Sequence, residues 1–325
     1  MRHQRLSRAR GHSIRKPSSR KRTTRLRVAV VIGSMMMTLP DCIRTVEDPS
    51  GYFVYHIQHP AVTAKVSGHG AHVMEWTPSG QTHGVLYLSP QAIFGVGKAI
   101  RGGIPICWPW FNAHATDTTK PMHGIARIQS WELLRADAQE RHVTLLFRLQ
   151  SSPETRALWP HDFVCHLGIS LGAQLEVSLM TQNLGAEPMI VTEALHTYLS
   201  VGDIQRTTVR GLAEARYLDT VGEPTQRQQD GDVIFDREVD RQYVSTAGVV
   251  IDDPTWERKI IVDKLGSGTT VVWNPWIEKS KRLADLPDED YKRFLCVEAA
   301  NAGEAAVRIL PGGQHVITTS VSVQG

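Results

Sequence analysis

The sequence contains few cysteines, and their spacing excludes two classes of small domain. Four occur among the 325 residues, at Cys42, Cys107, Cys165 and Cys296. They lie far apart and form no Cys-x-x-Cys pair, so the chain is neither a zinc finger nor a disulfide framework. Such sparse thiols are typical of proteins from a reducing compartment, and they predict a cytoplasmic protein.

Motifs for metal and nucleotide binding are missing as well. The sequence has no His-x-His pair, no His-Glu-x-x-His motif, no P-loop, no dinucleotide fingerprint and no Gly-x-Ser-x-Gly elbow. The residues therefore give no reason to expect a metal site. With 41% hydrophobic and 21% charged residues, the composition is that of a soluble globular protein and excludes collagen, coiled coil and disorder.

The basic and acidic residues are unevenly distributed between the first 27 residues and the rest of the chain. Residues 1–27 hold 11 Lys and Arg residues and no acid, which leaves 25 basic and 33 acidic residues, a net charge of −8, in the remainder. An acidic body argues against nucleic acid as the main partner.

The first 46 residues look unlike the rest and match no core-forming pattern. The apolar run Val28–Met37 is half the length of about twenty residues that spans a bilayer, so no membrane segment is expected, although the run would fit a signal peptide. Two interpretations stay open, a genuine basic leader or a start of translation at the methionines of 35–37. We therefore divide the chain into a leader, disordered or an artefact of start-site choice (1–46), and one folded domain (47–325).

From Tyr52 onward the sequence has the rhythm of an all-β protein. Short runs rich in Val, Ile, Leu and Tyr recur about every ten residues between Gly, Pro, Asn or Ser, without an internal repeat or a linker. They predict a single large antiparallel β-sandwich, two short helices (152–157 and 287–292) and a charged surface excursion (219–241). The predicted strands are 53–58, 61–66, 72–76, 84–88, 143–149, 163–171, 174–180, 189–199, 207–209, 249–251, 259–262, 269–273, 294–298 and 316–323.

Two titratable residues stand inside apolar segments. His196 is expected within the strand 189–199, where a fixed imidazole could act as a general acid or could simply be a hydrogen-bonded core residue. Glu298 ends the apolar run that begins at Phe294. If buried, its pKa would rise toward the range of a general base; the alternative is a strand-end glutamate that turns to solvent.

Two loops carry candidate binding residues. The segment 100–111 combines glycines, prolines, two tryptophans and Arg101, and it is either a sugar-binding loop or a packed irregular loop. Burial of Arg101 there would need an anionic or hydroxyl-rich partner. His123 and Arg127 are spaced four residues apart, which in an extended segment directs both side chains to one face. They could line one cleft with Arg101, or be a solvated pair.

Seven short motifs follow one another along the chain. They are Arg101-Gly-Gly-Ile-Pro with Cys107-Trp-Pro-Trp-Phe, His123-Gly-Ile-Ala-Arg127, Trp159-Pro-His-Asp-Phe163, Ala194-Leu-His-Thr-Tyr198 with Val201-Gly-Asp-Ile204, Val239-Asp-Arg-Gln-Tyr243, Trp273-Asn-Pro275 and Cys296-Val-Glu298. In type and order they resemble the D-hexose-6-phosphate mutarotases, the glucose-6-phosphate 1-epimerases of the aldose 1-epimerase superfamily. The resemblance covers 52–323 and implies a galactose mutarotase-like supersandwich.

The resemblance also implies a reaction and a set of site residues. Members of that family interconvert the α and β anomers of an aldohexose 6-phosphate without metal or nucleotide. By resemblance Glu298 is the base and His196 the acid, while Arg101, Arg127 and Asp240 bind substrate and His123 lies in the same cleft. We expect a monomer that acts on a small sugar phosphate, with neither nucleic acid nor membrane as partner.

Two other classes use similar folds. A non-catalytic carbohydrate-binding module could use the tryptophans and Arg101 without requiring Glu298 or His196. A glycosidase would need a second carboxylate across the scissile bond, and a polysaccharide lyase a longer groove.

Overall fold

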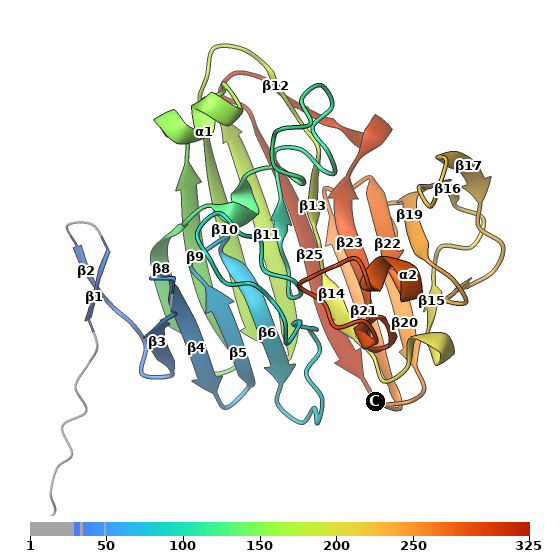
Figure 1. Cartoon of the computed structure of the whole chain (residues 1–325). Coiled ribbons are helices and arrows are strands. Elements are labelled where there is room, and N and C mark those ends of the chain that lie inside the picture. Colours follow the sequence, from blue (N-terminus) through green and yellow to red (C-terminus); the bar gives the residue numbers. More distant parts are fainter. Residues whose placement is uncertain (1–28, 33–34, 49) are drawn as a thin grey trace, which may run out of the picture.

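In the computed structural model of the protein, two large antiparallel sheets make up most of the molecule. The structure describes residues 29–32, 35–48 and 50–325. Strand β23 of one sheet contacts β21 and β25 of the other, and residues of both sheets join one hydrophobic core. In Figure 1 a smaller N-terminal sheet lies at one side of the molecule and strands β16 and β17 lie at the other. The predicted all-β sandwich is confirmed.

All strand pairs in the two large sheets are antiparallel. The nine-stranded sheet runs β18 (Val233–Ile234), β15 (Thr208–Arg210), β20 (Val249–Asp253), β21 (Arg258–Leu265), β25 (Gln314–Gln324), β11 (Gln174–Asn183), β10 (Phe163–Gly172), β9 (His142–Gln150), β8 (Glu132–Ala138). The eight-stranded sheet runs β17 (Thr225–Gln228), β16 (Arg216–Asp219), β19 (Val239–Val244), β22 (Thr269–Asn274), β23 (Phe294–Asn301), β13 (Glu193–Leu195), β7 (Ile106–Cys107), with β14 (Tyr198–Ser200) also on β23.

Smaller elements complete the fold. The four-stranded sheet runs β3 (Ile43–Glu47), β4 (Phe53–His59), β5 (Val62–Ser67), β6 (His72–Pro78), and two pairs stand apart, β1 (Ala29–Ile32) with β2 (Met35–Thr38) and β12 (Met189–Val191) with β24 (Val307–Ile309). The helices are α1 (Pro153–Leu158) and α2 (Trp276–Ser280), with short 3-10 turns η1 (Ala126–Ile128), η2 (Ile204–Arg206), η3 (Asp290–Arg293) and η4 (Gly303–Ala305). No helix among these described elements is long and apolar enough to cross a membrane.

Strand β23 shows how the sheet separates core from site. Every residue of this strand is buried, so the usual alternation of apolar and polar residues is absent. Leu295, Val297 and Ala299 join the core shared with the other sheet. Because successive side chains point to opposite faces, Cys296 and Glu298 lie on the other face, under the loops that cover the sheet.

Most predicted strands are present, with informative exceptions. Residues 84–88 form isolated bridges instead of a strand, through Leu86 to Leu199 and Leu88 to Gly102. The predicted strand 189–199 is broken into β12, β13 and β14. The prediction of a surface excursion at 219–241 was wrong in part, because this segment contains β17, β18 and the start of β19. The residues of β17 are exposed and carry no apolar signal.

Of the two predicted helices, one is present and the other is replaced by a 3-10 turn. The helix predicted at 152–157 is confirmed as α1, with Ser152 as its N-cap in a capping box with Thr155. The segment predicted at 287–292 forms the 3-10 turn η3, and α2 was not predicted.

The start of the folded domain lies earlier than the predicted boundary at residue 47. Strand β3 pairs with β4 along its whole length, and Leu39 and Ile43 are part of the core. The basic part of the predicted leader, residues 1–28, lies outside the described residues.

Candidate active site

Glu298 provides the buried carboxylate of the site. It lies in the middle of β23 opposite Val271 of β22, and its side chain is 1% exposed, so the alternative of a glutamate turned to solvent is wrong. Burial raises the pKa of Glu298 well above its usual value, and the nearby negative charge of Asp240 adds to this effect, while Arg127 opposes it.

His196 faces this carboxylate from a break between two strands. It was predicted inside a strand, but β13 ends at Leu195 and β14 begins at Tyr198. Its backbone N–H donates to the carbonyl of Pro105, which places the ring beside β23. The Nδ1 atom lies 3.3 Å from Oε1 of Glu298. Because His196 lies between two strands and is not part of either, its imidazole can reach the face of the sheet that carries Glu298.

The environment of His196 favours its neutral form. Burial lowers its pKa well below the usual value, and the nearby His123, Arg127 and Arg101 lower it further. Within the described part of the chain, Nδ1 of His196 and Oε2 of Glu298 are both buried without a hydrogen-bond partner. Buried polar atoms are normally satisfied, so these two point to a ligand.

Arg101 is held by two partners. Its Nε donates to Oδ1 of Asp285 at 3.1 Å, and its Nη1 donates to the hydroxyl of Tyr198 at 3.0 Å. These are the anionic and hydroxyl partners that burial of the guanidinium was expected to need. The loop reaches the sheet because Gly103, at φ +62°, packs its α-carbon against strand β6, where an added Cβ would lie 2.2 Å from the carbonyl oxygen of Val73.

Arg127 has a different environment. Its Nη2 donates to the carbonyl of Met122 at 2.9 Å, and its Nε is buried without a hydrogen-bond partner in the described structure. No carboxylate within 4.0 Å pairs with it among the described residues. Its positive charge acts on both His196 and Glu298.

His123 is a fixed hydrogen-bond donor. The segment 121–127 is not extended, since His123 has φ +61° and residues 126–128 form η1, so the spacing of four residues does not by itself direct His123 and Arg127 to one face. Its Nδ1 accepts from the backbone N–H of Asn112 at 3.1 Å, so the neutral ring carries its hydrogen on Nε2. Burial, Arg127 and Arg101 lower the pKa of His123 to about 3, which keeps the ring neutral.

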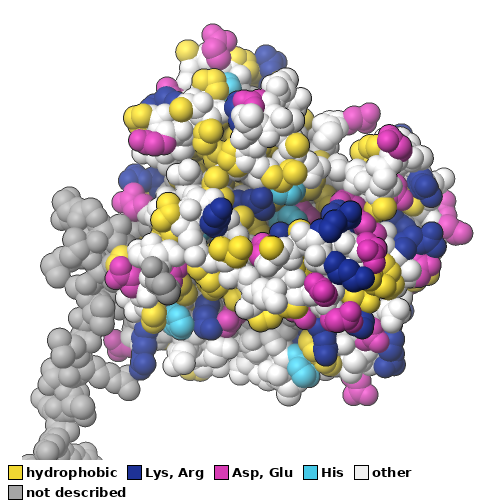
Figure 2. Space-filling model, in the orientation of Figure 1, with side chains coloured by type: hydrophobic (Ala, Val, Ile, Leu, Met, Phe, Trp, Pro, Cys, Tyr) yellow, Lys and Arg dark blue, Asp and Glu magenta, His cyan; other side chains and the backbone are white. Residues whose placement is uncertain are grey.

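Asp240 lies on β19 beside Trp273 of β22. Lys279 donates to its Oδ2 at 3.3 Å and also pairs with Glu238 at 3.0 Å. Burial raises the pKa of Asp240, while Lys279 lowers it. The six residues predicted from sequence thus converge on the Glu298 and His196 pair. Figure 2 shows histidine and basic side chains gathered in a hollow near the middle of one face.

Several neighbours of the pair had no predicted role. The ring of Tyr198 stacks on His196, and Trp273 presents its edge. Both residues belong to the sequence motifs, and this membership was the signal that could have identified them. Asp285 and Lys279 gave no signal, because a charged residue in a polar segment usually faces solvent.

Three of the buried groups form a possible metal-ligand cluster. One ligand atom each from His196, Cys296 and Glu298 lie within 4.8 Å of one another. Burial raises the pKa of Cys296 well above its usual value, so the thiol stays protonated. The charges of Arg101 and Arg127 also disfavour a cation here, so the cluster suits an anion better than a metal.

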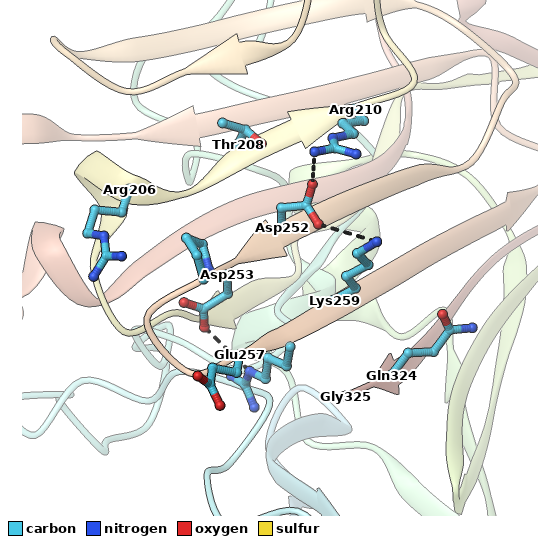
Figure 3. Close-up of a pocket in the computed structure, with 11 residues that line it drawn as sticks. Arg206, Thr208, Arg210, Asp252, Asp253, Glu257, Lys259, Gln324 and Gly325 are labelled. Atoms are coloured by element: carbon cyan, nitrogen blue, oxygen red, sulfur yellow. Dashed lines mark ion pairs between the residues drawn. The ribbon is translucent and has the colours of Figure 1, made fainter.

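A separate cavity of about 670 Å³ contains none of these residues. Figure 3 shows ion pairs among its charged side chains, while Arg206 and Glu257 pair with none of the residues drawn. Asp252 pairs with Arg210 at 2.5 Å and with Lys259 at 3.9 Å, and the buried Asp253 pairs with Arg258 at 3.5 Å. These pairs join β15, β20 and β21 and indicate a structural role.

The chain is similar to several known proteins. A protein of Escherichia coli (strain K12) named "putative glucose-6-phosphate 1-epimerase" is 38% identical over 250 residues, which are 76% of this chain and 83% of that protein. A protein of the same name from Salmonella typhimurium is 39% identical over 248 residues, 76% of this chain and 82% of that protein. The crystal structure of a "putative mutarotase" from Salmonella typhimurium has a TM-score of 0.82 at 34% identity and covers 88% of this chain and 95% of that one.

The matching family model is described as aldose 1-epimerase and spans residues 54–322. Together with these relatives it confirms the resemblance drawn from the motifs, including the mutarotase-like fold. The chain belongs to the aldose 1-epimerase family.

Proposed function

We propose that this enzyme interconverts the α and β anomers of an aldohexose 6-phosphate, with glucose 6-phosphate as the first candidate. The observation that carries the proposal is the buried pair of Glu298 and His196, with Oε1 and Nδ1 3.3 Å apart and one unpartnered polar atom on each side chain. The names of the relatives at 38% and 39% identity support the sugar phosphate as substrate class.

Ring opening requires one proton to leave the sugar and another to enter it. Glu298 takes the proton of the C1 hydroxyl as the C1–O1 bond becomes a carbonyl. His196 gives a proton to the ring oxygen as the C1–O5 bond breaks. After rotation at C1, the roles reverse and O5 attacks the other face of the carbonyl. Protons and electrons balance over the cycle, so the pair must hold one proton in all.

The two pKa shifts determine where that proton lies in the empty site. Burial raises the pKa of Glu298 and lowers that of His196, which favours the neutral form of both groups and hence the proton on Glu298. A bound phosphate offsets the charges of Arg101 and Arg127, which help to lower the pKa of His196. The proton is then more readily held by His196, as the opening step requires.

The remaining site residues have separate tasks in the proposal. Arg127, a half-buried guanidinium without a carboxylate partner in the described structure, contacts the phosphate or a sugar oxygen. His123 donates its Nε2 hydrogen to a sugar oxygen, since Asn112 occupies its Nδ1. Asp240 accepts from a sugar hydroxyl with the oxygen that Lys279 leaves free. Arg101 adds positive charge near the phosphate from its place between Asp285 and Tyr198.

Exchange spectroscopy by NMR tests the proposal directly, because it follows both anomers at equilibrium. The protein should accelerate exchange of glucose 6-phosphate over the spontaneous rate and should exchange free glucose at least tenfold more slowly, a difference of about 1.4 kcal/mol. Binding of glucose 6-phosphate without accelerated exchange would favour the carbohydrate-binding module instead. Equal acceleration of both sugars would refute the phosphate preference.

A further inference from the structure

The imidazole of His196 is oriented by aromatic rings. Tyr198 lies flat on it, with ring centroids 4.8 Å apart and planes inclined by 11°. Trp273 and His123 approach edge-on, with centroids at 5.9 and 5.8 Å. A functional histidine is commonly oriented by a hydrogen bond to one ring nitrogen, yet Nδ1 of His196 has no such partner in the described structure. Stacking therefore sets the plane of this ring.

Tyr198 is itself fixed at both ends. Its backbone N–H donates to the carbonyl of Gly103 at 2.9 Å, and β14 pairs it with Cys296, two residues before Glu298. At the far end of the ring, the hydroxyl accepts from Nη1 of Arg101 at 3.0 Å.

Arg101 transmits this restraint to a second loop. Its Nε donates to Asp285 at 3.1 Å, so the guanidinium has little freedom to move away from the tyrosine hydroxyl. The order Asp285, Arg101, Tyr198, His196 forms a continuous chain of contacts from a loop to the reacting nitrogen. Each member restricts the position of the next.

We propose that Tyr198 is a positioning residue that holds the plane of the His196 imidazole by stacking, with the Asp285 and Arg101 pair fixing the tyrosine from its hydroxyl end. The inference rests on the proposed function, because it assigns Tyr198 to the acid of that reaction. It adds a role to Arg101, which the motifs alone assigned to substrate binding.

Two substitutions separate the ring of Tyr198 from its hydroxyl. Tyr198→Phe keeps the stacked ring and the backbone bond but loses the hydroxyl bond to Arg101, so kcat should fall by only about threefold. Tyr198→Leu removes the stack and should lower kcat at least tenfold, about 1.4 kcal/mol, with little change in KM. Phe147→Leu is the matched control, because Phe147 is a buried ring of β9 in the core. It should lower stability and leave kcat unchanged.

The second readout is the Cε1 proton of His196 in NMR spectra, assigned by its loss in His196→Ala. Because a parallel ring shields protons above it, this resonance should lie upfield in the parent and in Tyr198→Phe. It should move downfield in Tyr198→Leu. The measurement on the parent alone keeps the proposal testable if the leucine variant does not fold, since an unshifted resonance would overturn it.

Kinetic outcomes distinguish this inference from the proposed function. Parental kcat in Tyr198→Leu, with exchange abolished in His196→Ala, would overturn the positioning role and leave the acid in place. Equal losses in the leucine and phenylalanine variants would show that the hydroxyl matters and the stack does not. Full exchange in His196→Ala would instead refute the proposed function.

Discussion

Glu298→Gln separates the proton chemistry of the site from its packing. Gln has nearly the shape of Glu, but its amide neither accepts a proton at neutral pH nor returns one. If Glu298 transfers the proton of the C1 hydroxyl, kcat should fall by about 10² to 10⁴, the usual contribution of a positioned proton-transfer group. That loss corresponds to about 2.7 to 5.5 kcal/mol of transition-state stabilisation.

The structure predicts that the fold will survive this substitution. Burial raises the pKa of Glu298 and so favours its neutral form, which Gln replaces by another neutral group. The amide adds one buried donor next to an oxygen, Oε2, that has no partner in the described structure. An unsatisfied buried donor costs about 1–3 kcal/mol, which is less than the usual 5–15 kcal/mol stability of a domain.

The assay is anomer exchange of glucose 6-phosphate by NMR, with urea unfolding as the control for stability. His196→Ala should cause a loss of similar size. The double variant should be little worse than the poorer single one, because both groups serve one proton relay and residues acting as a unit are non-additive. Near-parental exchange in a folded Glu298→Gln protein would refute the assignment of the base. Additive losses would refute the single relay.

Three further outcomes follow from the charges in the structure. The profile of kcat/KM against pH should be bell-shaped, with its two limbs in the reverse of the usual order for Glu and His. Uptake of a second proton by His196 sets the acid limb, because the pKa of His196 is lowered. Loss of the last proton from Glu298 sets the basic limb, because the pKa of Glu298 is raised. NMR titration showing that His196 protonates along the basic limb would contradict this. Arg127→Met should narrow the preference for glucose 6-phosphate over glucose at least tenfold, about 1.4 kcal/mol, and an unchanged rate ratio would remove Arg127 from anion recognition. The bond to the buried Glu193 raises the pKa of His315 above its usual value, so this pair stabilises the fold fully below the unfolded pKa, about 6.5, and progressively less as pH rises through the folded pKa. Urea unfolding should show a stability difference between the parent and His315→Gln that shrinks toward high pH, and a constant difference would mean that the pair is not protonated.

The expected order of the two limbs of the pH profile differs from the order in which glutamate and histidine titrate in water. In water a glutamate loses its proton before a histidine does. Within this sheet, both groups are shielded from solvent and lie near charges of opposite effect, with Asp240 acting on the carboxyl and the two arginines on the imidazole. These shifts favour the single proton on Glu298, and in the proposed reaction a bound phosphate lowers the cost of moving it to His196 because it offsets the two arginines.

The sequence by itself determined the fold class, and it predicted the residues that the structure places around the candidate site. Short runs rich in Val, Ile and Leu predicted β9, β10 and β11, since the residue types that favour a strand are a local property of the chain. The polar edge strand β17 was missed because its exposed residues join the sheet through backbone hydrogen bonds alone. The break at His196 was missed because the apolar pattern continues across it.

Only the tertiary structure decided how the site residues act on one another. Glu298 and His196 are about a hundred residues apart in sequence, and the pairing of β23 with β13 and β14 brings them together. The bonds from Arg101 to Asp285 and to Tyr198 likewise join distant segments. Proton affinity, ring orientation and the partners of a buried charge depend on neighbours in space. They could be established only once the sheets had placed those neighbours side by side.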